Sequence, residues 1–330
     1  MAARPTLKTV AQAVGVTANT VSLALRGSPL VAEKTKTAIL AEARRQGYQH
    51  DAAAQALRCG RSRVIALAFG DIANPLFAIK IKLLAQQFAQ AGYETLILNT
   101  DEAEETEVKA IRTALSRKVE GVVLCPCQKG REALELLHGQ GVPCVLIGRQ
   151  FDSPQEDAVV WDDRRGGYLA TRRLLELGCR HPLYLTAAPS ISSARLRLEG
   201  FRQALEEAGM PENGLVREVS PLGDDLGRLL DTLPKETDGV FAFNDLLAWR
   251  LMCMLKRPLP VVGFDDIQSA LAAPIPLSSI HSDLEEETRL TARLLLERIE
   301  QPERPLQTLV MPVSLTVRDA RENEKATGSR

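Results

Sequence analysis

Long apolar runs are missing from this sequence. No stretch approaches the roughly 18 apolar residues that a membrane-spanning helix needs, and the N-terminus carries no apolar signal-peptide core. We therefore expect a cytoplasmic protein with no membrane contact. Cysteine is sparse too: the six cysteines among 330 residues are scattered and match no zinc-binding spacing, which predicts reduced thiols and no metal site.

Motifs for catalysis and nucleotide binding are also absent. The first predicted strand is not followed by G-x-G-x-x-G, and the chain contains no G-x-x-x-x-G-K-[ST], G-x-S-x-G or H-E-x-x-H. The four histidines are isolated from one another. We therefore expect no dinucleotide or other cofactor, and no enzyme activity.

Positive charge is concentrated at the start of the chain. Residues 1–63 contain ten Lys or Arg and three Asp or Glu, whereas the remainder contains 31 basic and 39 acidic residues. A small basic unit on an acidic body is typical of a protein whose head binds a polyanion. A solvated basic surface would account for the charge alone, so the local pattern has to decide.

Two short helices joined by a tight turn are predicted over residues 6–25. Thr6 is a suitable N-cap for the first helix, apolar residues recur within it at spacings of three and four, and Gly15 ends it. Thr17 is a suitable N-cap for a second helix that begins at Ala18. This pattern is typical of a helix-turn-helix, whose second helix enters the DNA major groove N-terminus first.

Two further helices are predicted before the body begins. One covers residues 33–46 and ends at Gly47, which gives the head enough apolar faces for a small core. The other lies within His50–Arg63, is rich in alanine, and is too short to be stable alone in water. We expect it to form on DNA or against a second subunit.

Short apolar strands alternate with amphipathic helices from residue 64 onward. The first series of predicted strands is Val64–Gly70, Glu94–Thr100, Gly121–Pro126 and Pro143–Gly148. The pattern restarts with Ala158–Asp162, His181–Thr186, Gly214–Val219, Gly239–Asn244 and Pro260–Asp265, and a last strand is predicted at Thr308–Asp319. This order predicts two parallel-sheet α/β lobes, with a ligand in the cleft beyond the carboxyl ends of the strands.

Several motifs resemble one family along the whole chain. The pattern T-x-x-x-V-A-x-x-x-G-V-[ST]-x-x-T-V-S occurs at Thr6, Val10, Ala11, Gly15, Val16, Thr17, Thr20, Val21 and Ser22, and a hinge pattern follows at Tyr48, Ala54 and Leu57. In the body, similar runs are Asn74–Phe77, Gly148–Gln150, Ser192–Phe201, Phe243–Asp245 and Gly263–Asp266. With these residues the chain resembles the LacI/GalR family of bacterial transcriptional regulators.

The resemblance implies a domain plan. An all-α helix-turn-helix DNA-binding domain would cover residues 1–49, and a hinge helix with a linker would cover residues 50–63. A two-lobed, doubly wound parallel-sheet core of the periplasmic-binding-protein type would cover residues 64–320, for effector binding and dimerisation. Residues 321–330 would form a polar tail, which lacks leucine heptads and so favours a homodimer over a tetramer.

The resemblance also assigns DNA contacts. The residues implied are Thr6, Thr17, Ala18, Asn19, Thr20, Ser22, Leu23, Ala54 and Leu57. Asn19 can pair with adenine, while the hydroxyl groups and the helix N-terminus would hold phosphates. Leu57 would act as an apolar wedge in the minor groove, where the paired hinge helices of a dimer kink the duplex.

Effector contacts follow from the same resemblance. The residues implied are Leu76, Phe77, Cys125, Arg149, Trp161, Arg197, Asn244 and Asp265. For four of them an alternative stays open. Trp161 can stack on a sugar face or simply pack in the core. Asn244, like Asp265, can merely cap the helix that follows it. A solvated helix face would account for Arg197 and its neighbour Arg195.

The sequence thus predicts a repressor that binds a palindromic double-stranded DNA operator as a homodimer. A small effector, a sugar or sugar phosphate, would control it as an inducer or as a corepressor. One alternative is a solute-binding protein for transport, which would need an export signal and has no use for residues 1–63. Another is an α/β enzyme with an extra N-terminal domain, which would need a catalytic constellation that the sequence does not show.

Overall fold

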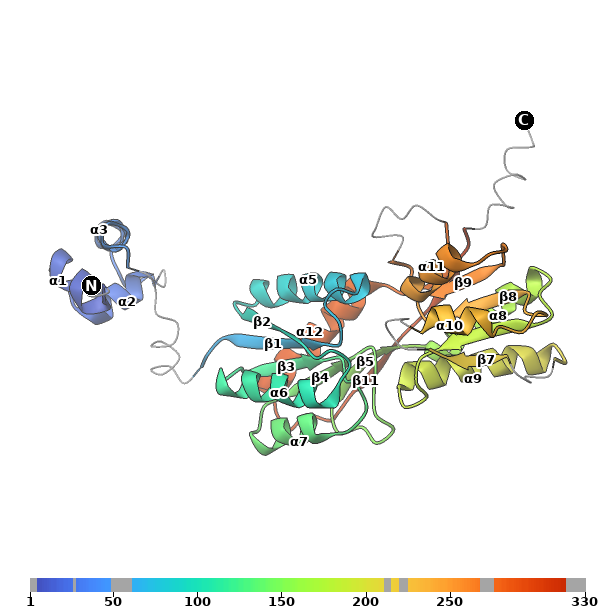
Figure 1. Cartoon of the computed structure of the whole chain (residues 1–330). Coiled ribbons are helices and arrows are strands. Elements are labelled where there is room, and N and C mark those ends of the chain that lie inside the picture. The colour runs from blue at the N-terminus through green and yellow to red at the C-terminus, as the bar shows by residue number, and fades with distance from the viewer. Residues whose placement is uncertain are drawn as a thin grey trace. The chain divides into compact units, whose positions relative to one another are not determined.

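The computed structural model describes residues 5–25, 28–48, 61–210, 215–219, 225–267 and 276–318. The chain separates into two compact units, residues 1–62 and 63–330, which we call the head and the body (Figure 1). None of the described helices is long and apolar enough to cross a membrane.

The described part of the head consists of three short helices whose ends are set by local hydrogen bonds. They are α1 (Leu7–Val14), α2 (Ala18–Leu25) and α3 (Glu33–Gln46). Thr6 and Thr9 cap α1 reciprocally, each side chain accepting a hydrogen bond from the other residue's backbone N–H. Gly15 ends α1 with φ 74°, and Thr17 Oγ1 begins α2 by accepting a hydrogen bond from the N–H of Thr20 at 3.1 Å.

A single small core holds the head together. Val10, Val21 and Ile39, one from each helix, are completely buried in one cluster. Burial of these side chains is the main favourable contribution to folding of such a short segment, because each helix alone is marginal in water. The predicted helix-turn-helix is confirmed.

The described residues of the body form two six-stranded sheets, one in each lobe (Figure 1). The first sheet has the order β11-β5-β4-β3-β1-β2, with β1 (Val64–Phe69), β2 (Glu94–Asn99), β3 (Gly121–Leu124), β4 (Cys144–Ile147), β5 (Asp157–Trp161) and β11 (Thr308–Met311). The second has the order β12-β10-β9-β8-β6-β7, with β6 (Pro182–Thr186), β7 (Val216–Glu218), β8 (Gly239–Ala242), β9 (Val261–Phe264), β10 (Ser278–His281) and β12 (Ser314–Thr316). All pairings are parallel except β10 with β12. The predicted two-lobed α/β fold is confirmed.

Helices cover both faces of each sheet, which explains why the inner strands β1, β3, β4, β8 and β9 are apolar along their whole length. In β1, Leu67 faces the cluster under α5 (Pro75–Gln90) and α12 (Leu284–Glu300), whereas Ala66 faces the cluster under α6 (Glu104–Ser116) and α7 (Glu132–Gly139). The second lobe repeats the plan. There, α8 (Asp163–Glu176) and α9 (Ser192–Glu207) lie on one face, and α10 (Leu226–Asp231) and α11 (Asp245–Met254) lie on the other.

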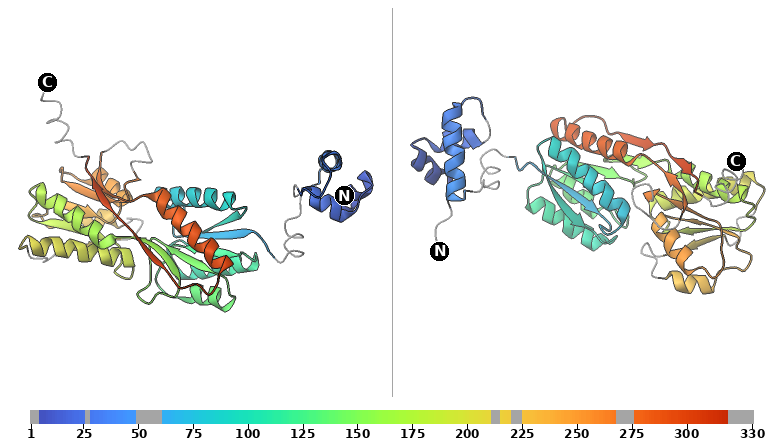
Figure 2. Two further views of the ribbon diagram at one scale, coloured as in Figure 1. Left: turned by 180° about the vertical axis from the view of Figure 1, so that it is seen from behind. Right: turned by 90° about the horizontal axis from the view of Figure 1, so that it is seen from above.

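Within the segments that the structure describes, the chain crosses between the lobes three times. It crosses from β5 to α8, from β10 to α12, and from β11 to β12 (Figure 2). Hydrogen bonds join the crossings: the N–H of Asp162 donates to Met311 O at 2.9 Å, and Ser282 Oγ donates to Pro312 O at 3.1 Å. The three crossings therefore form one connected hinge.

Three details differ from the sequence prediction. The segment Ala158–Asp162 is predicted to begin the second lobe, but β5 pairs with β4 and β11 in the first sheet. The segment Thr308–Asp319 is predicted as one strand, but Pro312 has no N–H to donate and lies between β11 and β12, which join different sheets. The strand β10 is not predicted at all, because its serines give little apolar signal.

Candidate functional site

A cavity of about 750 Å³, measured with its open mouth, lies between the two lobes of the body. The first lobe contributes Asp71, Asn74, Leu76, Phe77, Lys80, Glu102, Cys125, Gly148, Arg149 and Trp161. The second lobe contributes Asp163, Ser193, Arg197, Phe243, Asn244, Leu246 and Asp265. All eight residues that the sequence predicts for effector binding are in this lining. Most of them lie at or just beyond the carboxyl ends of strands, where parallel sheets bind ligands.

The N-terminus of α5 forms one apolar wall. Asn74 Oδ1 accepts a hydrogen bond from the N–H of Leu76 at 3.0 Å, and Pro75 occupies the first helical position. This cap fixes the first turn, so that Leu76 and Phe77 are held against the cavity and are both nearly buried. The run Asn74–Phe77 therefore serves both as a helix start and as cavity lining.

Arg149 enters the cavity already paired. Its guanidinium makes two hydrogen bonds to the Glu102 carboxylate, at 2.6 and 3.0 Å, and a third to Pro126 O at 2.9 Å. Glu102 lies in the loop after β2, and it packs so closely on Gly70 that any Cβ at position 70 would overlap its carboxylate. The sequence prediction missed Glu102, because nothing local in the loop marks it as a partner of a residue 47 positions away.

Arg197 is held in the same way in the second lobe. Its Nε donates to Asp163 Oδ1 at 2.8 Å, its Nη1 donates to the backbone oxygen of Phe243, and its Cζ lies 3.4 Å from the centre of the Phe264 ring. Burial raises the pKa of Asp163, and the positive charge of Arg197 opposes that rise. Arg197 is only 6% exposed, so the alternative of a solvated helix face is wrong for this residue.

The same alternative does describe Arg195. Its guanidinium is partly exposed and pairs with Asp152 at 2.5 Å, outside the cavity lining. The two arginines are two positions apart on α9, so they point in different directions around the helix. Only Arg197 faces the ligand site.

Lys80 and Glu287 form a buried ion pair that the sequence prediction missed. Lys80 Nζ lies 2.9 Å from Glu287 Oε1, with side chains only 4% and 0% exposed. Burial raises the pKa of Glu287, and Lys80 opposes this. Helical spacing from Phe77 places Lys80 on the inward side of α5, but its partner on α12 lies 207 residues away.

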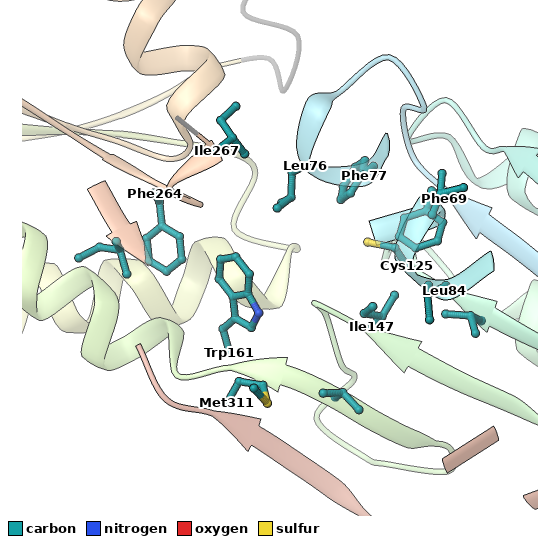
Figure 3. Packing of buried hydrophobic residues seen from close by; sticks show 14 of the residues in the cluster. Phe69, Leu76, Phe77, Leu84, Cys125, Ile147, Trp161, Phe264, Ile267 and Met311 are labelled. Carbon is teal, nitrogen blue, oxygen red and sulfur yellow. The ribbon is translucent and has the colours of Figure 1, made fainter. Parts of the chain in front are cut away.

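Trp161 packs across the gap between the lobes. Its ring is stacked on Phe264 of the second lobe, with centroids 5.8 Å apart and an interplanar angle of 17°, and Lys80 Nζ lies 4.6 Å from its centre. Figure 3 shows Trp161 between Phe264 and the start of α5. These contacts favour the packing role for Trp161 over a free surface for stacking a sugar.

Asn244 has two roles at the end of β8. Its Oδ1 accepts a hydrogen bond from the N–H of Leu247 at 2.8 Å and so caps α11. The same residue lines the cavity, with its amide in reach of a ligand. Capping fixes the side chain in place, so it does not compete with binding.

Asp265 and Asp266 form a strained turn at the end of β9. Both have positive φ, 105° and 49°, a conformation that non-glycine residues seldom adopt. Two interactions with neighbouring segments fix the turn. Asp266 pairs with Arg318 at 2.5 Å, and Asp245 accepts hydrogen bonds from Ser279 Oγ at 2.6 Å and from a backbone N–H of the turn. Such over-determined strain is typical of functional positions.

The turn leaves the carboxylate of Asp265 available in the cavity. Across the described parts of the chain, no hydrogen bond or ion pair engages this side chain, although it is only 5% exposed. Burial raises the pKa of Asp265 to about 7. The alternative that Asp265 serves only as a helix cap has no hydrogen bond to support it, whereas an acceptor facing the ligand fits its position.

The head presents the N-terminal end of α2 at its surface. Thr17 and Asn19 are exposed, and the hydroxyls of Thr17 and Thr20 lie 2.9 Å apart. Ala18 and Leu23 are half-buried and pack partly on the head core. Thr6 is exposed at the start of α1 and Ser22 is half-buried on α2, whereas Ala54 and Leu57 lie outside the described residues.

The described segments contain no group of three or more His, Cys, Asp or Glu side chains placed to bind a metal ion. Burial raises the pKa of Cys125 in the cavity wall to about 11, so that its thiol stays protonated.

Comparison with known proteins covers both units. A family model described as "Bacterial regulatory proteins, lacI family" matches residues 6–51, and one described as "Periplasmic binding proteins and sugar binding domain of LacI family" matches residues 62–256. The HTH-type transcriptional regulator DegA of Bacillus subtilis (strain 168) is 30% identical, over 96% of this chain and 97% of that protein. A solved complex of the transcriptional regulator CelR with cellobiose has a TM-score of 0.70 and 28% identity, over 96% of this chain and all of that chain. The lac repressor dimer bound to operator and an anti-inducer has a TM-score of 0.81 at 22% identity, over 96% of this chain and 98% of that chain, and shows the fold alone.

Proposed function

We propose, from the premise that this chain belongs to the LacI family of bacterial transcriptional regulators, that it is a repressor controlled by a sugar in the interlobe cavity. The observation that carries the proposal is the convergence of Arg197, Asn244 and Asp265 on one cavity, in a chain that also has a helix-turn-helix head. Effector binding would change the affinity of the homodimer for a palindromic operator. The protein acts in the cytoplasm, where its DNA lies.

Sugar recognition fits the chemistry of this cavity. Arg197 supplies N–H donors, Asn244 supplies an amide, and Asp265 supplies an acceptor, which together match the donors and acceptors of neighbouring hydroxyl groups. Leu76 and Phe77 offer an apolar wall for the C–H face of a ring. The CelR structure, similar over 96% of this chain, contains cellobiose, which supports the same ligand class here.

DNA recognition would lie with the helix-turn-helix domain and with the hinge helix and linker that follow it. We assign it to residues 1–49 and 50–63, with Asn19 reading a base and Thr6, Thr17, Thr20 and Ser22 near phosphates. Ala18, Leu23, Ala54 and Leu57 complete the proposed contact set by the family resemblance. Exposure of Asn19 at the start of α2 supports its part in this set.

Regulation would work through the hinge between the lobes. We assign effector binding and dimerisation to residues 64–320 of the body. Its three crossings are joined by hydrogen bonds, and the cavity is lined from both sides of them. A sugar that binds one arrangement of the lobes better shifts the protein toward that arrangement, by about 1–3 kcal/mol of coupling free energy. The sugar is bound and released without being changed, so we propose no enzymatic step.

Selection of bound duplexes from a random DNA pool tests this function. The full-length protein is expected to enrich one palindrome, because site symmetry mirrors the symmetry of a dimer. Affinity for that duplex is then measured with a panel of sugars, which are recovered afterwards and checked for chemical change. An Arg197→Met variant should lose the sugar response, whereas the matched Arg195→Met variant should keep it. Failure to enrich any sequence, with and without sugars, would refute the DNA-binding proposal.

A further inference from the structure

The cations in the cavity wall are already neutralised by the protein itself. Among the described residues, three cations line the cavity, and each has a carboxylate partner. Arg149 is paired with Glu102, Arg197 with Asp163, and Lys80 with Glu287. The N–O distances of these three pairs are 2.6, 2.8 and 2.9 Å. The cavity therefore offers no unpaired positive charge from its described lining.

Negative charge is in surplus instead. Among the described residues, Asp265 has no ion-pair partner, and the Asp71 carboxylate accepts one hydrogen bond, from the N–H of Ala73 at 2.9 Å. A phosphate or carboxylate in this cavity would meet these carboxylates, and it would have to displace an internal one to reach an arginine. The displaced carboxylate would then be left near a second negative charge in a poorly solvated site.

Neutral hydroxyl groups face no such conflict. Arg197 uses Nε for Asp163 and one N–H of Nη1 for Phe243 O, so its Nη2 keeps donors for a ligand. Asp265 accepts from hydroxyl groups, and so can form hydrogen bonds without any charge on the ligand. The paired guanidinium of Arg149 likewise retains N–H groups beyond the three that Glu102 and Pro126 take.

We infer that this cavity selects effectors without negative charge, so that a free sugar binds and its phosphate ester or sugar acid does not. The inference rests on the proposed sugar control and narrows it to one chemical class. The three internal ion pairs act as a charge filter, by which we mean that they exclude anions: carboxylates of the protein already occupy the cationic groups that an anionic ligand would need. The phosphate ester of a bound sugar should bind at least about a hundredfold more weakly than the sugar.

Matched ligand pairs test the filter. Each neutral sugar is compared with its phosphate ester and its sugar acid, by the shift in melting temperature of the full-length protein and by the change in operator affinity. The inference is supported when the responses are confined to neutral members. Tighter binding of a charged member overturns the inference and leaves sugar control intact. If no member of any pair changes the melting temperature or the operator affinity, the sugar proposal is overturned. The exclusion of anions from the cavity is then tested with inorganic phosphate.

Binding of inorganic phosphate tests whether the cavity accepts an anion, and this test does not require the effector to be known. Trp161 and Trp249 are the two tryptophans of the chain, so a Trp249→Phe variant leaves the cavity tryptophan as its own fluorescent reporter. Phosphate should leave this signal unchanged. A Glu102→Gln change in that background frees Arg149 and should make the signal respond, whereas Glu132→Gln, which breaks the exposed pair with Arg112, should not. A saturable phosphate response without the Glu102 change would overturn the inference.

Discussion

Replacing Lys80 with methionine while Glu287 stays in place should destabilise the body strongly. The two side chains are 2.9 Å apart and nearly inaccessible to water. At an effective dielectric constant of about 20, their attraction is about 6 kcal/mol, and much of it is offset by the loss of hydration of both ions. Removing one partner leaves the other buried and unpaired, so we expect the free energy of unfolding to fall by about 3–5 kcal/mol.

A double-mutant cycle separates the lost pair from lost packing. The Lys80→Met/Glu287→Leu variant removes both charges and keeps apolar volume, so it should recover most of the stability lost in Lys80→Met. Urea denaturation of the four proteins at pH 7 gives the coupling free energy. Glu286→Gln, which disrupts an exposed pair with Arg289, is the control and should change stability by less than about 1 kcal/mol.

The pH dependence gives an independent check of the same pair. Without Lys80, the pKa of the buried Glu287 carboxyl should rise further, because burial is then less opposed. Folded Lys80→Met protein would hold a proton that the unfolded chain releases, so its stability should fall as pH rises above the usual glutamate value of about 4.3. The reasoning is refuted if single and double variants are equally unstable and show the same pH dependence as the native protein.

Three other outcomes are expected. Affinity for a neutral sugar should rise about tenfold between pH 6 and pH 8, because hydroxyl groups donate to the ionised form of Asp265, whose pKa is about 7. Titration calorimetry measures this affinity, and the affinity of the Asp265→Asn variant should not change with pH. A Gly200→Ala change should lower the free energy of unfolding by about 1–3 kcal/mol or more and weaken sugar binding, because the new Cβ would overlap the backbone of α8 at Arg164. The control Gly139→Ala places its Cβ in open space and should change stability little. An Asn19→Ala change should reduce binding to the selected duplex by about 1–3 kcal/mol in fluorescence anisotropy and leave binding to random DNA unchanged, and an equal loss on both would show that Asn19 reads no base.

Local patterns carried most of the fold prediction. The caps of α1 and α2, with Gly15 between them, depend on hydrogen bonds within a few residues, so the sequence alone shows them. The buried parallel strands are equally visible as short apolar runs separated by amphipathic helices. Their assignment to lobes is not, because β5 and β11 meet across about 150 residues of chain and no local signal marks the pairing.

In the cavity, too, the sequence predicts the individual residues but not the contacts between distant parts of the chain. Its eight predicted residues came from the family resemblance, and the structure places all of them in the lining of one cavity, from both lobes. What the sequence could not supply is the pairing of charges. Glu102 is a loop residue far from Arg149 in sequence, and Glu287 lies on a helix whose apolar periodicity gives no hint of Lys80. The positive φ of Asp265 could not be predicted from the sequence either, because an aspartate does not indicate a positive φ in the way that a glycine can.

The route of the chain through the hinge has a consequence for biosynthesis. The first sheet is completed by β11 and the second by β12, so neither lobe can finish before the ribosome has made residues 308–316. The core of the head, in contrast, is complete once α3 has emerged at residue 46. At typical elongation rates, roughly 10–60 seconds separate these two events. Each nascent chain therefore carries a folded head before it has a sensor, and chains truncated within that interval would have the head without the body on which the proposed dimer and its control by ligand depend.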